Sequence, residues 1–456
     1  MTTLRERPLP GVGAERALAP LPSDLPPVER RAVIPGGFVA GGMRAGIKAS
    51  ERPDLALIAK SGVASLAAAA VYTPNRFAAA PVRLSQANLA STGGEPSSGR
   101  ADVVICTSGC ANAATGPAGD ADQAAVGRIV AAATGSAEDH ILHLSTGIIG
   151  TRLPLDRVEP AVAALASRLE STDEGLLAAA EALRTTDSVT KVATVSVDGV
   201  RVTGIAKGVG MIHPRMATML SVLLTDADAS PAVLRGVLRR VVARTWNQIS
   251  VDGDTSTNDT VFLLASGASG VSVDADAASR AVFAKAVEAV ARDLARQQAA
   301  DGEGATALIT CQVSGARDDA DARAVARAVI SSSLVKAAVH GRDPNWGRLA
   351  GAAGNATLPD AAVLSGSGLS ADEARTRGGS AAALDPETLR IAIAGHLVYD
   401  GAAGGPVPFD RAAARESMGG KEVLFRLDLG LGDGVGEAFG CDLTETYVRE
   451  NSEYTT

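Results

Sequence analysis

The sequence predicts an α+β protein in which a layered, sheet-on-sheet core is flanked by helices and accompanied by a smaller second α/β domain. Strand-like segments occur in adjacent pairs and helical segments in blocks, without the regular alternation that is typical of a doubly wound sheet. The chain has 456 residues, which is enough for two or more domains. Apolar residues make up 46% of it but aromatic residues only 3%, so aliphatic side chains must fill the core.

Both strands and helices are predicted in the first half of the chain. Short strand-like runs separated by Pro, Asn and Gly turns are predicted over residues 33–97. Buried strands are predicted in residues 101–116 and 140–150, where apolar runs close on turns of small residues. Helical spacing of Ala, Val, Ile and Leu predicts helices over residues 120–134, 155–169 and 173–184.

The second half begins with a predicted β-hairpin over residues 191–208, because Asp198-Gly199 is favoured in two-residue turns. A strand should follow Thr218, and residues 365–385, rich in Gly, Ser and Ala, are expected to be a surface loop. The remaining predicted elements are helices at 232–246, 277–299 and 319–331, and strand-like runs at 259–267, 305–316, 388–400 and 422–442.

The balance of charge disfavours two classes of partner. A formal net charge of −8 argues against nucleic acid or an anionic membrane surface. Residues 1–32 are rich in Pro and Arg, lack the apolar region of a signal peptide, and are expected to form a flexible extension. No apolar run approaches the length of a membrane span, so we expect a cytoplasmic protein.

Two sets of residues resemble metal ligands at first sight. The four cysteines lack a second Cys or His pair that would complete a zinc site, and we expect buried free thiols at Cys106, Cys110, Cys311 and Cys441. The acidic segment 250–260 contains Asp252, Asp254 and Asp259 but lacks the spacing of a calcium loop. We interpret it as a hydrogen-bonded turn network and expect no metal.

Thr218 stands between Ala217 and Met219, where a glycine-rich stretch runs into a strand-like segment. An ordinary strand threonine is one interpretation. The other is a nucleophile whose own α-amine acts as the base, which requires that the preceding peptide bond be cut. The Thr218 hydroxyl would attack the Ala217 carbonyl, and hydrolysis of the resulting ester would release the amine. Its pKa, about 8 when unperturbed, is expected to fall near Lys207.

The turn Ser145–Gly150, with the sequence STGIIG, is a candidate oxyanion site. A turn that follows a strand directs backbone N–H groups outward, and Gly147 would let a substrate approach closely. An ordinary turn at the end of a strand remains the alternative.

The stretch KGVGMIHPRMATML, residues 207–220, resembles the self-cleavage signature of the ornithine acetyltransferase family (glutamate N-acetyltransferases). Further blocks resemble that family in the same order, among them SGCANAATG, STGIIG, TTDS, DGEGAT and the terminal CDLTETYVRENSEYTT. Together they extend from about Gly36 to Thr456. The resemblance implies an N-terminal-nucleophile type fold and a protein that cuts its own chain. The products would be an α chain of residues 33–217, preceded by the extension 1–32, and a β chain of residues 218–456.

The resemblance also implies a ping-pong reaction of arginine biosynthesis. Thr218 would take the acetyl group from N-acetylornithine and pass it to glutamate, with Thr146 and Gly147 holding the oxyanion. The implied substrate contacts are Thr185, Lys207, Thr218, Glu303, Asn451 and Thr456. No cofactor is implied, and the cleaved chains would associate as (αβ)₂ or a larger assembly.

Some residues depart from the family's pattern, namely Thr107, Cys110, Arg215 and Ala307. Arg215 places a bulky cation beside the cleavage junction, where it would affect cutting or the choice of acceptor. We interpret residues 343–348, DPNWGR, as a structural turn with Trp346 as a packing anchor, and leave a supporting role for Arg348 open.

Three interpretations of function follow. The first is this acetyltransferase, or a paralogue of specialised metabolism that moves an acyl group between other amines. The second is an N-terminal-nucleophile amidase that uses water as the final acceptor. The third is an uncleaved scaffold without acyl transfer. No motif decides whether acetyl-CoA is also a donor.

Overall fold

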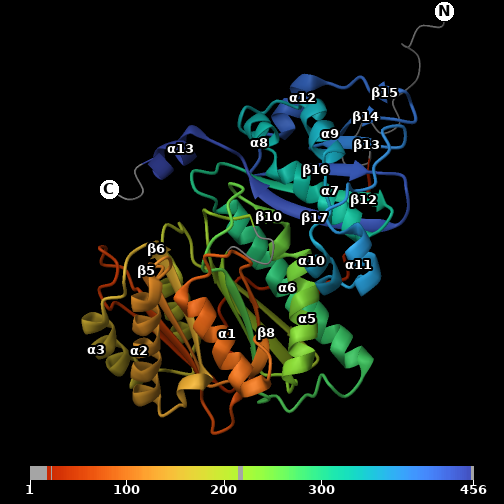
Figure 1. Ribbon diagram of the computed structural model, residues 1–456. Coiled ribbons are helices and arrows are strands. Elements are labelled where there is room, and N and C mark those ends of the chain that lie inside the picture. Colours follow the sequence, from red (N-terminus) through yellow and green to blue (C-terminus); the bar gives the residue numbers. More distant parts are fainter. Residues whose placement is uncertain (1–17, 22, 214–218, 453–456) are drawn as a thin grey trace, which may run out of the picture. The chain divides into compact units, whose positions relative to one another are not determined.

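The computed structural model describes residues 18–21, 23–213 and 219–452 (Figure 1). The chain divides into two compact units. Of the described residues, the larger unit contains 24–213, 219–247 and 252–303, and the smaller unit contains 18–21, 23, 248–251 and 304–452. No helix in the described part of the chain is long and apolar enough to cross a membrane.

Two sheets form the centre of the larger unit. The first has the order β1-β2-β5-β6 and consists of β1 (Phe38–Met43), β2 (Leu55–Lys60), β5 (Val103–Cys110) and β6 (Ile141–Ile148). The second has the order β4-β3-β11-β9-β8-β7 and consists of β4 (Ser98–Ala101), β3 (Leu66–Tyr72), β11 (Thr260–Ala265), β9 (Leu220–Thr225), β8 (Val200–Lys207) and β7 (Lys191–Val197). The pairs β5–β6 and β9–β11 are parallel, and all other neighbours are antiparallel.

One shared core joins the two sheets. Side chains from both sheets, such as Val104, Leu144, Val222 and Phe262, belong to the same buried apolar cluster. The helices of this unit are α1 (Ala80–Gly93), α2 (Gly116–Thr134), α3 (Leu155–Ala166), α4 (Asp173–Leu183), α5 (Pro231–Arg244) and α6 (Ala277–Ala300). Figure 1 shows α2 and α3 on one side of the unit and α5 and α6 on the other. The predicted sheet-on-sheet core flanked by helices is therefore confirmed.

The smaller unit is built on one mixed sheet of order β10-β17-β12-β16-β13-β14-β15. Its strands are β10 (Ile249–Ser250), β17 (Gly434–Cys441), β12 (Leu308–Ala316), β16 (Glu422–Asp428), β13 (Arg390–Ile393), β14 (His396–Asp400) and β15 (Gly405–Pro406). Its helices are α7 (Asp319–Ser331), α8 (Ser333–His340), α9 (Trp346–Gly354), α10 (Ala361–Gly366), α11 (Ala371–Arg377), α12 (Arg411–Ser417) and α13 (Glu445–Ser452). Helix α7 packs against β12 and β17, as expected for the predicted second α/β domain.

Two predictions of local structure were wrong. Residues 365–385, expected to be a loop, contain α11, which a capping box of Ser370 and Glu373 opens. Residues 33–97, expected to hold strands and turns, also contain α1, in which several polar side chains interrupt the apolar spacing. Within the predicted extension, Glu29 forms backbone hydrogen bonds of 2.9 and 2.8 Å with Thr194 of the larger unit, whereas residues 1–17 lie outside the described part.

Burial of His143 on β6 gives a testable pH dependence. The imidazole is fully buried, Gln123 lies 3.0 Å from its Nδ1, and burial lowers its pKa to about 3. In the unfolded chain the imidazole takes up a proton near pH 6.5. As the pH falls from about 6.5 to 3, the free energy of unfolding therefore decreases by about 1.4 kcal/mol per pH unit. For His143→Gln, the unfolding free energy measured with urea should therefore change less with pH than for wild type. Between about pH 4 and 6, its change per pH unit should be smaller by about 1.4 kcal/mol. Equal slopes in both proteins would contradict the assignment.

Candidate active site

The parallel strands β5 and β6 pair Gly109 with Gly147, one residue before each strand ends. Gly147 has φ +127°, and a Cβ there would lie 2.3 Å from the carbonyl carbon of Gly109. Only glycine fits such a position, because a side chain would meet the backbone of the next strand. The half-buried pair Thr146 and Gly147, predicted to hold an oxyanion, therefore forms a tightly constrained strand end.

Lys207 reaches this strand end from the second sheet. It is the last residue of β8, and its Nζ donates a hydrogen bond of 3.1 Å to Oγ1 of Thr146. Two residues that are 61 positions apart, and that the family resemblance named, are thus in direct contact. Both side chains are half-buried.

The turn that carries Thr185 is held by Asp187. The carboxylate of Asp187 accepts hydrogen bonds from the backbone N–H of Thr185 at 3.0 Å and of Gly208 at 2.7 Å. Burial opposes ionisation of Asp187, but the charges of Lys207 and Lys191 outweigh it and hold its pKa well below the usual range. Sequence analysis did not single out Asp187, although the quoted TTDS block contains it.

Glu303 lies at the end of the segment that follows α6 and contacts the same turn. Its Oε1 accepts a hydrogen bond of 3.0 Å from the Thr186 hydroxyl, and its backbone N–H donates to Val209 at 2.9 Å. A Cβ on Gly210 would lie 2.4 Å from its carboxylate, so glycine gives this carboxylate room. Glu303 thus contacts Thr186 and Val209, which are the neighbours of Thr185 and Gly208 along the chain.

The acidic segment 250–260 is the predicted hydrogen-bonded network. Asp252 accepts hydrogen bonds from the N–H groups of Met211 at 2.5 Å and Ile212 at 2.8 Å, and burial raises its pKa. Asn258 donates to the carbonyl groups of Ala111 at 2.6 Å and Ser145 at 2.8 Å. The segment thus supports both the chain that leads toward the predicted cleavage junction and the strand end at Thr146.

A second residue that sequence analysis missed is Lys48. Its Nζ donates to the Pro53 carbonyl at 2.6 Å, and its side chain packs beside Gly109. Burial lowers its pKa to about 8, Asp54 opposes this shift, and Lys207 adds to it. Lys48 lies in the stretch GIKASERPDLALI, which is another block that resembles the family.

The remaining predicted residues lie outside the described part of the chain or in the smaller unit. Ala217, Thr218, Arg215 and Thr456 lie outside the described residues. Asn451 lies in α13 of the smaller unit, where its amide donates to the Tyr447 carbonyl at 3.0 Å.

Two residues of β5 that depart from the family's pattern, Thr107 and Cys110, have structural roles. Thr107 is buried, and its Oγ1 lies 2.8 Å from Oγ of Ser145. Cys110 is buried with its Sγ 3.2 Å from the Thr151 carbonyl oxygen, and all four cysteines are buried and free, as predicted. In the part of the chain that the structure describes, no group of three His, Cys, Asp or Glu side chains could hold a metal ion.

The segment 343–348 begins α9 in the smaller unit. Asn345 caps that helix, and the ring of Trp346 packs against Tyr399 with 5.2 Å between centroids. The predicted packing role of Trp346 is confirmed. Arg348 donates to the Leu334 carbonyl at 2.8 Å.

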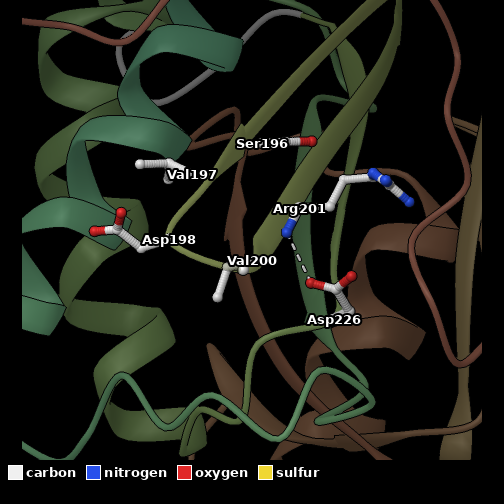
Figure 2. A pocket seen from close by; sticks show the side chains of 7 residues that line it. Ser196, Val197, Asp198, Val200, Arg201 and Asp226 are labelled. Atoms are coloured by element: carbon white, nitrogen blue, oxygen red, sulfur yellow. Dashed lines mark hydrogen bonds between the residues drawn. The ribbon is translucent and has the colours of Figure 1, made fainter.

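Two pockets are lined by none of the predicted site residues. Figure 2 shows one at the β7–β8 turn, of about 280 Å³, where the backbone N–H of Arg201 donates to Asp226 at 2.8 Å. The other, of about 470 Å³, is in the smaller unit and is lined by His340, Arg342 and Arg415 among others. Neither is lined by a residue that the sequence singled out.

Curated relatives resemble this chain along almost its whole length. The arginine biosynthesis bifunctional protein ArgJ of Thermus thermophilus is 44% identical over 423 residues, which cover 93% of this chain and 99% of the relative. The chloroplastic protein of the same name from Ricinus communis is 43% identical over 441 residues, covering 93% and 87%.

Two solved structures also match part of the chain. One is the arginine biosynthesis bifunctional protein argJ from Bacillus halodurans, with 37% identity, a TM-score of 0.44, and coverage of 52% of this chain and 99% of that one. The other is ornithine acetyltransferase complexed with ornithine from Mycobacterium tuberculosis, with 39% identity, a TM-score of 0.39, and coverage of 42% and 99%. The family model described as the ArgJ family matches residues 39–456, and with relatives of this identity and coverage the chain belongs to the ArgJ family.

Proposed function

We propose that this protein cuts itself between Ala217 and Thr218 and then transfers acetyl from N-acetylornithine to glutamate through an acetyl ester on Thr218. Membership of the ArgJ family makes the chain an acyltransferase of arginine biosynthesis. The self-cleavage, the ping-pong order and the individual residue roles are the parts that we propose.

The hydrogen bond from Lys207 to Thr146 carries the proposal. An ammonium group only donates, so the Thr146 hydroxyl is the acceptor in this bond and its own hydrogen is directed elsewhere. Donation from a cation also polarises that hydroxyl and makes it a stronger donor. In the proposed reaction its acceptor is the oxyanion of the tetrahedral intermediate, with the N–H of Gly147 as the second donor.

The charges in the larger unit suit an amino-acid substrate. Lys207 provides an ammonium group for a carboxylate, and Glu303 provides a carboxylate for an ammonium group, with Thr185 between them in the network described above. A buried charge without such a partner costs several kcal/mol. The family resemblance adds Asn451 and Thr456 as further substrate contacts.

The proposed steps balance in atoms and protons. In the precursor, the Thr218 hydroxyl attacks the Ala217 carbonyl, and water hydrolyses the resulting ester to leave a carboxylate on Ala217 and a free amine on Thr218. In each turnover that amine takes the hydroxyl proton while the oxygen attacks the acetamide carbonyl of N-acetylornithine. Ornithine leaves with the proton. The amine of glutamate then attacks the acetyl ester, the C–O bond to Thr218 breaks, and the proton lost by the glutamate amine passes through the Thr218 amine to the Thr218 oxygen.

Acetyl-labelled N-acetylornithine, incubated with the purified protein and glutamate, should give labelled N-acetylglutamate. Free labelled acetate would instead support an amidase that uses water as the acceptor. Label that stays on the donor would mean that the chain acts on other amines, as a paralogue of specialised metabolism would. A parallel incubation with labelled acetyl-CoA tests whether that donor is also used.

The proposed assembly is at least (αβ)₂, formed from the cleaved chains in the cytoplasm. Two complementary chains in each protomer would be held together by the shared core that joins β5, β6 and β9. Native mass spectrometry should show equal numbers of both chains in one particle of at least four chains. A particle with one chain type would contradict this assembly.

A further inference from the structure

A buried cluster of three charged side chains lies behind the predicted substrate residues. Lys191, the first residue of β7, is fully buried, and its Nζ lies 2.7 Å from Oδ1 of Asp187 and 2.5 Å from Oδ2 of Asp301. The side chain of Asp187 is also fully buried, and that of Asp301 is 9% exposed. Buried ion pairs often contribute little net stability, so their presence suggests a role in positioning.

The carboxylate of Asp187 fixes two segments at once. Its Oδ2 accepts the N–H of Thr185 and its Oδ1 accepts the N–H of Gly208, which follows Lys207 directly. Gly208 has φ +141°, a conformation that side chains rarely adopt, so the chain turns sharply after the lysine. Asp187 therefore sets the distance between the Thr185 turn and the end of β8.

The carboxylate of Asp301 fixes the third segment. It accepts the backbone N–H of Ser188 at 3.1 Å and the hydroxyl of the same residue. Asp301 stands two residues before Glu303, which accepts the hydroxyl of Thr186. The end of α6 is thus tied to the same turn, and Lys191 joins the two carboxylates that hold it.

We propose that Asp187, Lys191 and Asp301 form a positioning cluster that holds Thr185, Lys207 and Glu303 at the spacing that an amino-acid substrate requires. This inference rests on the function proposed above. The three side chains act through their neighbours and not on the substrate itself. Loss of the cluster should therefore weaken substrate binding more than it slows the chemical step.

The charges around the cluster predict how it responds to the loss of Lys191. Asp187 faces Lys191 and Lys207, Asp301 faces Lys191, and Arg184 donates to the backbone carbonyl of Asp187 and not to its carboxylate. Without Lys191, the carboxylates of Asp187 and Asp301 would lose the ammonium group that lies between them. They would repel each other and move the Thr185 turn away from the end of α6.

Lys191→Met should therefore show a defect in substrate binding. We expect the KM for glutamate to rise about tenfold, with kcat changed by no more than about threefold. The matched control is Lys60→Met, which breaks an ion pair of 2.9 Å with Asp102 elsewhere in the same unit. Its KM should stay within about twofold of wild type. A folded Lys191→Met whose KM for glutamate is within about twofold of wild type would overturn the proposal.

Asp301→Asn tests the same proposal if Lys191→Met does not fold. The amide keeps an oxygen for Ser188 but loses the charge that faces Lys191, and the KM for glutamate should rise about fivefold. A folded Asp301→Asn with a wild-type KM would overturn the positioning role. Transfer by the wild-type protein is measured first, and its absence would contradict the proposed function. If wild-type transfer is normal and the variants have an unaltered KM, only the positioning cluster is contradicted.

Discussion

Thr218→Ala is expected to leave one unsplit chain of 45.9 kDa that transfers no acetyl. Alanine lacks the hydroxyl that is proposed to attack the Ala217 carbonyl, so no ester would form and no new amine would be released. The same substitution removes the proposed nucleophile of the transfer reaction, and activity should fall at least about 10⁴-fold. Intact mass measurement and the labelled-acetyl assay report the two losses separately.

Thr218→Ser is the matched variant, because serine keeps both the hydroxyl and, after cleavage, the α-amine. We expect it to split, although more slowly, and to retain measurable transfer. Two fragments from Thr218→Ala would exclude Thr218 as the residue that cuts the chain. Transfer by unsplit Thr218→Ala would exclude it as the nucleophile.

The elements that were predicted correctly have a local cause. The hairpin over residues 191–208 turns at Asp198 and Gly199, whose φ values of +48° and +79° are those that an Asp-Gly pair adopts readily. Helix α5 begins where the sequence shows a serine cap, since Ser230 accepts the N–H of Val233. Helix α7 occupies the predicted residues 319–331 because its apolar spacing is regular.

The two helices that were missed, α11 and α1, lack a clear local sequence pattern. Helix α11 has seven residues and one buried side chain, Ala374, so it leaves almost no periodic pattern in a stretch rich in Gly and Ser. Helix α1 buries Ser85 and Asn88 along with its apolar residues. These polar side chains bond to the carbonyl groups of His143 and Ile141, which are contacts that no local pattern reveals.

The same distinction holds for the candidate site. Thr146, Gly147, Lys207 and Glu303 were named through the family resemblance, which attaches roles to short blocks of sequence. The role of Asp187 depends on residues that are distant in sequence. It bonds to Gly208, 21 positions away, and to Lys191, whose other partner, Asp301, is 110 positions from that lysine. An aspartate in a polar turn is common in any loop, so only the folded chain distinguishes it.

Gly147→Ala is expected to lower kcat about 10² to 10³-fold, which is the range for loss of one oxyanion donor. Position 147 has φ +127°, and the new methyl group would lie 2.3 Å from the Gly109 carbonyl carbon. The ends of β5 and β6 must therefore separate or turn. Either movement displaces the N–H of residue 147 and the hydroxyl of Thr146 from the proposed oxyanion. Both donors must be placed to within fractions of an ångström for catalysis.

Gly150→Ala separates this effect from backbone strain. Gly150 lies in the same turn and also has a positive φ, +84°, but a Cβ there would meet no atom within 4 Å. Both variants should lose about 1 to 3 kcal/mol of unfolding free energy from the strained conformation, measured in urea. Only Gly147→Ala should slow acetylation of Thr218 in a single turnover, because only there does the methyl group push against the neighbouring strand. Equal acetylation rates in the two variants would place the oxyanion site elsewhere than at the end of β6.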